Sequence, residues 1–196
     1  MANDKFIENR AQRNEAGKYG YKNAKGEVII PFEYDTPIEW DKEFMIPKKD
    51  NKTGVLDWQG NIIIPFEYDY ISRYGWYGDS CFKVEKDKKW GILDRNNNII
   101  LSIEYSNFKT KRCPEGVFII AKKNYKCGVI DFAEKVILPF EYDFLESNYN
   151  APYPPDSSLV AAKDGKWTVI DIFGNQIIPE MYDQIYTLFN ALGYKF

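Results

Sequence analysis

The stretch Lys52–Asp69, KTGVLDWQGNIIIPFEYD, decides the fold, because this chain of 196 residues repeats it in five variants. The copies occupy residues 18–35, 52–69, 89–106, 126–143 and 166–183. Each copy keeps one distance from a small residue, here Gly54, to a tyrosine, here Tyr68. A fixed internal spacing indicates one supersecondary unit that recurs along the chain. We therefore predict a single repeat domain over residues 1–196.

Each repeat predicts four short antiparallel strands. The second full unit divides into Tyr68–Ser72, Cys81–Lys86, Lys89–Asp94 and Asn98–Leu101, and these segments alternate apolar and polar residues or are rich in β-branched ones. The third and fourth strands are joined by Asp-x-x-Gly-Asn, as at residues 57–61, which is typical of a tight hairpin. Proline follows the isoleucine-rich strand in four copies, and we expect it to end that strand because it lacks a ladder donor.

The two ends of the chain predict how the units close. The last motif ends in Met181–Phe189, a first strand with no partner after it, whereas the chain starts with third and fourth strands at Lys18–Asn23 and Glu27–Pro31. Strands from both termini would complete a fifth unit and leave no open sheet edge. The expected fold is all-β, a five-bladed β-propeller-like ring of four-stranded antiparallel units. The alternative is an open β-solenoid of the same units.

The pattern K-W-G-x-(I/L)-D, a glycine turn and then I-I-P-x-x-Y-D resembles the WG-repeat (KWG) family of bacterial β-repeat proteins. The resemblance covers roughly residues 18–189, and its clearest matches are Trp90-Gly91 and Trp167. Other copies depart from it, with Cys127 at the tryptophan position and Ser106 at the last aspartate. The family implies binding or scaffolding modules, in some bacterial settings partners of secreted toxins, and it implies no enzyme activity.

The composition excludes several functions. The chain has no histidine, which removes the commonest general base and metal ligand. It also lacks phosphate-binding glycine motifs and calcium-loop spacing, so we expect no enzyme activity, no metal and no cofactor. A net charge of −3 argues against nucleic acid. The absence of a long apolar run argues against a membrane span, and the three cysteines without a signal segment favour the cytoplasm.

The repeated carboxylates and tyrosines are interpreted as structural. Glu-Tyr-Asp at residues 67–69 would place two carboxylates on one face of a strand, as in a glycosidase pair. The same triplet recurs in three copies, however, and one active site does not need several. We expect the tyrosine to pack between units and the aspartate to bond to the next turn. Cys113, in the loop KRCPEG, is expected to be a solvent-exposed or half-buried thiol, because no histidine is present to activate it as a nucleophile.

Function is expected where the copies differ. Successive motif tyrosines lie 34, 37, 37 and 40 residues apart, and nearly all of the variation falls between the first and second strands. Insertions at equivalent positions are typical of a binding face, and these segments combine aromatic residues with Gly, Ser, Asn and Pro. The candidate partner-binding residues are Trp40, Arg73, Tyr74, Trp76, Tyr77, Lys111, Arg112, Tyr149 and Tyr153.

Two functions of different classes follow from these loops. The first is a non-catalytic module that binds a protein partner through one loop-rich face, and a specific version of it is an immunity protein that covers a toxin domain. The second is a carbohydrate-binding propeller, whose loop aromatics stack on sugar rings. A structural role, in which the aromatics cover the mouth of the ring, is the alternative to both.

Overall fold

A computed structural model describes residues 12–23, 25–37, 40–41, 43–57, 59–76, 79–147, 157–178 and 181–183. Within these ranges every regular element is a β-strand, so the prediction of an all-β protein is confirmed. The chain divides into two compact units, residues 1–103 and 104–196. Of the terminal strands predicted to close a ring, Lys18–Asn23 and Glu27–Pro31 correspond to two strands of the first sheet, whereas residues 184–189 of the last one lie outside the described residues.

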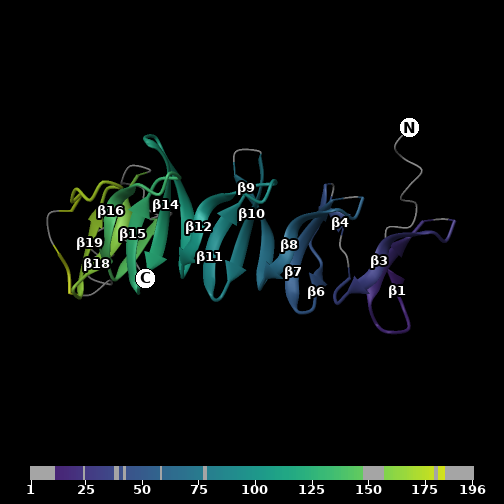
Figure 1. Cartoon of the computed structure of the whole chain (residues 1–196). Coiled ribbons are helices and arrows are strands. Elements are labelled where there is room, and N and C mark those ends of the chain that lie inside the picture. Colours follow the sequence, from purple (N-terminus) through teal and green to yellow (C-terminus); the bar gives the residue numbers. More distant parts are fainter. Residues whose placement is uncertain are drawn as a thin grey trace, which may run out of the picture. The chain divides into compact units, whose positions relative to one another are not determined.

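The first unit contains three antiparallel sheets, each built from neighbours in the sequence (Figure 1). Strands β9–β12 form a four-stranded sheet in chain order, and β1–β3 form a three-stranded sheet. In the remaining sheet β5 and β6 both pair with β7, on either side of Pro47, and together replace one strand. The strands are β1 Gln12–Arg13, β2 Tyr19–Lys22, β3 Val28–Tyr34, β4 Trp40–Asp41, β5 Phe44–Met45, β6 Lys48–Lys49, β7 Lys52–Asp57, β8 Ile62–Tyr68, β9 Tyr70–Trp76, β10 Asp79–Lys86, β11 Lys89–Leu93 and β12 Ile99–Tyr105.

The second unit repeats the same meander twice (Figure 1). Its strands are β13 Asn107–Cys113, β14 Gly116–Lys123, β15 Lys126–Ile130, β16 Val136–Tyr142, β17 Phe144–Ser147, β18 Leu159–Lys163 and β19 Lys166–Ile170. Strands β13–β16 form a four-stranded sheet and β17–β19 a three-stranded one. Isolated bridges join β19 to Gln176 and Tyr182, which stand at the place of a fourth strand. The predicted four-stranded antiparallel unit is thus confirmed.

The motif prolines do not end the fourth strand, and that prediction is wrong. Pro31, Pro65 and Pro139 lie inside β3, β8 and β16, each of which continues to the motif tyrosine. The ladder between β7 and β8 shifts register between Ile64 and Tyr68, so Pro65 falls in an irregular stretch. A bulge of this kind leaves a backbone position without a ladder bond, and proline is tolerated there.

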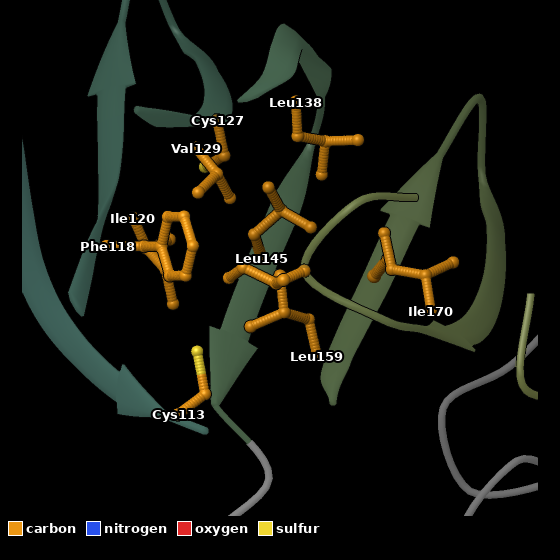
Figure 2. Packing of buried hydrophobic residues seen from close by; sticks show 11 residues of the cluster. Cys113, Phe118, Ile120, Cys127, Val129, Leu138, Leu145, Leu159 and Ile170 are labelled. Atoms are coloured by element: carbon orange, nitrogen blue, oxygen red, sulfur yellow. The ribbon is translucent and has the colours of Figure 1, made fainter. Parts of the chain in front are cut away.

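Buried aliphatic and aromatic side chains form the cores within each unit. In the first unit, Val55 and Ile64 pack with Phe82 and Leu93 of the next sheet. In the second unit, the core joins Phe118, Val129 and Leu138 to Leu145 and Leu159 of the following sheet (Figure 2). Each sheet therefore buries one face against its neighbour in the sequence, which is how repeat units that cannot fold alone stabilise one another.

Candidate functional site

The motif aspartates are structural, as predicted. Asp57 accepts hydrogen bonds from the backbone N–H groups of Gln59 and Asn61 and closes the hairpin between β7 and β8. Asp69 pairs with Lys52 at 2.6 Å and accepts a hydrogen bond from the N–H of Asp87, in the next sheet's hairpin turn. The side-chain amide of Asn61 also donates to the other oxygen of Asp57. Both oxygens of each carboxylate are therefore used, and the repeated acids hold turns together instead of forming a reactive pair.

A second set of repeated contacts links each sheet to the next. Lys86 of β10 pairs with Glu67 of β8 at 3.0 Å, and its ammonium lies 5.6 Å from the ring centre of buried Tyr68. The same three residue types meet again as Lys123, Glu104 and Tyr105, and as Lys163, Glu141 and Tyr142. The prediction that the motif tyrosine packs between neighbouring repeats is confirmed. The Lys, Glu and Tyr residues that recur in these copies thus stabilise the contact between successive sheets.

Two hairpins project beyond the rest of their sheets. Strands β9 and β10 pair from Trp76 and Asp79 inward, whereas β11 pairs with β10 only from Phe82 onward. Strands β13 and β14 pair from Cys113 and Gly116 inward, whereas β15 pairs with β14 only from Ile119 onward. Each hairpin therefore ends in a two-stranded ribbon of three residue pairs, and these ribbons contain the segments whose length and sequence vary between copies.

The predicted partner-binding residues lie on these hairpins, on strand β4 or outside the described residues. Arg73 is exposed on β9, and its guanidinium lies 5.2 Å from the ring centre of Phe44. Tyr74 is half-buried beside it. The backbones of Trp40 and Trp76 belong to β4 and β9, and the other three aromatics, Tyr77, Tyr149 and Tyr153, lie outside the described residues.

Lys111 and Arg112 do not form the pair of surface cations that their adjacency in the sequence suggests. Successive residues of a strand face opposite sides. Lys111 has 8% of its surface exposed, whereas Arg112 is exposed. Cys113 is also buried and belongs to the core of the second unit, so the expectation of a solvent-exposed thiol is wrong (Figure 2). Its segment is strand β13, and alternation turns Cys113 inward with Lys111.

The second unit also contains a cavity of about 370 Å³ that sequence reasoning missed. Its lining includes Tyr105, Glu134, Lys123 and Phe140. The phenol of Tyr105 donates a hydrogen bond to the Glu134 carboxylate at 2.9 Å, and its ring stacks on that of Phe140 with centroids 6.2 Å apart. Glu134 adopts a φ of 59°, in a hairpin turn where three other copies have glycine and one has Asn97, and this departure was the available signal.

The charged groups of this cavity already have partners. Glu104 pairs with Lys123 at 2.6 Å, and Lys126 pairs with Asp143 at 2.5 Å. Burial, together with the hydrogen bond and charge of Glu134, raises the pKa of Tyr105 well above its usual range, so the phenol stays protonated. The cavity thus has a mixed lining of paired charged groups and two aromatic rings.

The described residues give no sign of a metal centre or a membrane helix. Among them, no three His, Cys, Asp or Glu side chains gather as metal ligands would. Among the described residues there is also no helix with the length and apolar character needed to cross a bilayer. The three cysteines are buried and form no disulfide.

The sheets and their repeated contacts define a class of protein, one built from tandem antiparallel β-meanders. The particular family follows from comparison with family models. The model of the WG containing repeat matches residues 19–38, 54–90 and 90–127. The chain therefore contains WG repeats over these residues, and the resemblance seen in its sequence is confirmed.

Comparison with other proteins adds little to this. No curated protein matches the chain. A solved structure described as "Crystal structure of the eukaryotic initiation factor" is similar over 88% of this chain at 14% identity, with a TM-score of 0.45. The chain spans about half of that protein, 51% of its length.

Proposed function

We propose that this WG-repeat protein is a non-catalytic interaction module that binds a protein partner through its projecting hairpins. The observation that carries the proposal is the register of β9–β10 and β13–β14, which extends each hairpin three residue pairs beyond the third strand. In each ribbon the third strand of the sheet is absent, so one face can meet a partner while the other face, with Cys81 or Cys113, is buried. Protein recognition commonly uses exposed ribbons of this kind.

The side chains on the hairpins support the same function. Arg73 and Arg112 are exposed on β9 and β13, and arginine is enriched at binding hot spots. Gly75 lies two residues after Arg73 on β9, and a methyl group added to it would meet no atom within 4 Å. The buried faces of the same ribbons, with Cys81 and Cys113, fix the hairpins to the body of the protein. A rigidly held ribbon loses little entropy when a partner binds.

A more specific version of the proposal is an immunity protein that covers a toxin domain. It rests on the family's implication and on the net charge of −3, which suits a basic partner. The odd number of cysteines is in keeping with a reducing compartment such as the cytoplasm. In this version the arginines would contact acidic groups of the partner, while the overall field steers its basic surface.

Charge reversal on the hairpins tests the proposal. The tagged chain, its Arg73→Glu/Arg112→Glu variant and an Arg95→Glu control are compared for binding to the product of the neighbouring reading frame. Arg95 is exposed in the turn between β11 and β12, away from both hairpins in the sequence. We expect the double variant to lose the partner while the control and the melting temperature stay unchanged.

Two outcomes would contradict this function. Equal binding by the double variant would move the interface away from the hairpins. Saturable binding on a glycan array, with no protein partner, would favour the carbohydrate-binding alternative. That alternative depends on the loop aromatics Trp76, Tyr77, Tyr149 and Tyr153, and no described contact favours it.

The arrangement of the units is proposed separately as the five-bladed ring that the two chain ends predict, with the open solenoid as its alternative. Small-angle scattering distinguishes them. A compact ring of this length has a radius of gyration of about 16 Å, whereas an open row of the same units gives a clearly larger value. The second result would contradict ring closure and leave the proposed interaction through the hairpins intact.

A further inference from the structure

The tryptophan of the repeat occupies a defined place on its sheet. In the β9–β11 sheet, Tyr70, Glu85 and Trp90 lie in one row across three strands. The rings of Tyr70 and Trp90 meet edge to face with centroids 5.8 Å apart, and the Lys83 ammonium lies 4.6 Å from the indole centre. An indole at this place is thus held by a first-strand aromatic and a second-strand side chain.

The last sheet fills the same place in the same way. There the row is Phe144, Ala162 and Trp167 across β17, β18 and β19. The rings of Phe144 and Trp167 lie 5.3 Å apart, and both pack on the pair Val160 and Val169. Two copies of the repeat therefore show which group this position is built to hold.

The sheet between them lacks both rings. Its row is Asn107, Lys122 and Cys127, so a small amide and a thiol replace the first-strand aromatic and the indole. A cavity of about 160 Å³ opens here, and its lining includes all three of these residues and Ile120, which stands at the position of Lys83. The space that the missing rings leave has not been closed by the surrounding chain.

We propose that this cavity, the Cys127 pocket, binds a flat aromatic ring of indole size. Its volume is close to that of an apolar cavity of about 150 Å³ that accepts benzene in another protein. Ile120, Leu145 and Cys127 provide apolar contacts, as Val160 and Val169 do for Trp167. The bound ring would take the place that Trp90 and Trp167 take in the neighbouring copies.

Polar groups at the rim suit an aromatic ligand. Lys109 is held there by an ion pair with Glu146 at 2.7 Å, and Lys122 occupies the middle of the row. An ammonium within about 6 Å of an aromatic face is attracted to it, and Lys83 shows that contact with Trp90 in the preceding sheet. The side-chain oxygen of Asn107 accepts the N–H of Phe108 at 2.8 Å, and its amide NH2 can donate a hydrogen bond to a ligand's backbone carbonyl.

The inference does not depend on the hairpin interface. The pocket could take its ring from a free indole compound or from a tryptophan side chain of a protein. The two ligands share the ring, and only the second has a peptide backbone attached. Indole and N-acetyl-tryptophanamide are therefore titrated in parallel into the full chain, followed by calorimetry and amide NMR. A tighter fit for the amide assigns the pocket to a protein side chain, and a tighter fit for indole assigns it to a small molecule.

The expected result is saturable binding of one ring, with shifts centred on Asn107, Lys122 and Cys127. Cys127→Trp should weaken binding roughly tenfold or more, because its own indole fills the pocket. Asn107→Tyr restores the ring of Tyr70 at an exposed position and serves as a second block in case the first variant does not fold. Arg73→Glu, on a strand that does not line the pocket, should leave binding unchanged. Absence of saturable binding to the wild-type chain, or equal binding by both blocking variants, would overturn the proposal.

Discussion

The phenolic O–H of Tyr105 donates a hydrogen bond to the Glu134 carboxylate at 2.9 Å. This bond joins the end of strand β12 to the hairpin turn that precedes β16. Glu134 has the left-handed backbone that other copies give to glycine, as at Gly60 and Gly174, or to asparagine, as at Asn97. A side chain in this conformation is disfavoured. The hydrogen bond to Tyr105 offsets part of this backbone strain. It exists in one described copy of the repeat, because only that copy has a carboxylate at this position.

Replacing Glu134 with glutamine should lower the pKa of Tyr105. The negative charge of Glu134 disfavours the phenolate, while burial, the larger cause, remains in the variant. The Tyr105 pKa should therefore fall but stay above its usual value. NMR titration of the tyrosine rings measures it, with Glu67→Gln as the control, because Glu67 acts on Tyr68, whose pKa is raised to about 12 chiefly by burial. An unchanged Tyr105 pKa in Glu134→Gln would contradict the contact.

Gly54→Ala should destabilise the protein by about 1–3 kcal/mol through overpacking. A methyl group at this position would lie 2.9 Å from the carbonyl oxygen of Ile64 and equally close to the ring of Phe66. Gly75→Ala is the matched control, because nothing lies within 4 Å of the new methyl group there, and its effect should stay within about 0.5 kcal/mol. Urea unfolding of both variants measures the difference, and equal midpoints would contradict the close approach.

Asp69→Asn should destabilise the protein at neutral pH and have no effect in strong acid. The hydrogen bond from Lys52, then the N–H of Asp87, lowers the pKa of Asp69 below its usual 3.8. A lowered folded-state pKa gives stability that is present above pH 3.8 and is lost as the pH falls through the folded value. Thermal unfolding across this window tests it. Ser106→Asn, at the copy without the carboxylate, should show no such pH dependence.

Trp90→Ala should destabilise the protein by about 2–4 kcal/mol, below the upper end for a fully buried aromatic because the indole is half-buried. The lost contacts are the edge-to-face packing with Tyr70 and the ammonium of Lys83 above the ring. Trp90→Phe keeps an aromatic ring and should recover most of the stability. A loss below about 1 kcal/mol in the alanine variant would show that the indole does not support the sheet.

Some of these features could be predicted from the sequence because they are local. The Asp57 turn, the meander of short strands and the role of Tyr68 all depend on contacts within one repeat or with the next, and five copies display them at constant spacing. The predicted ends of the strands were less accurate. Strand β12 extends to Tyr105, and β3, β8 and β16 continue past their prolines. A bulge depends on how two strands twist together, which one strand's sequence does not show.

The candidate sites depended more on the fold. Lys111 and Arg112 are neighbours in sequence, and only the register of β13 places them on opposite faces. The Cys127 pocket was visible as a departure from the motif, but a cysteine in place of tryptophan predicts a cavity only if no other side chain fills the space. Asn107 and Cys127 come from different strands, and their shared row across β14 was decided by pairing.

The sequence by itself determined the repeat, its antiparallel strands and its family. Five similar motifs at regular spacing encode one structural repeat and the contacts that it makes with the next repeat. Only the tertiary structure decided which residues of the variable segments face solvent and where cavities remain between side chains. Alternation along a strand depends on register, and a cavity depends on the packing of several strands at once. The proposed interface at the projecting hairpins rests on the first of these properties, and the proposed Cys127 pocket rests on the second.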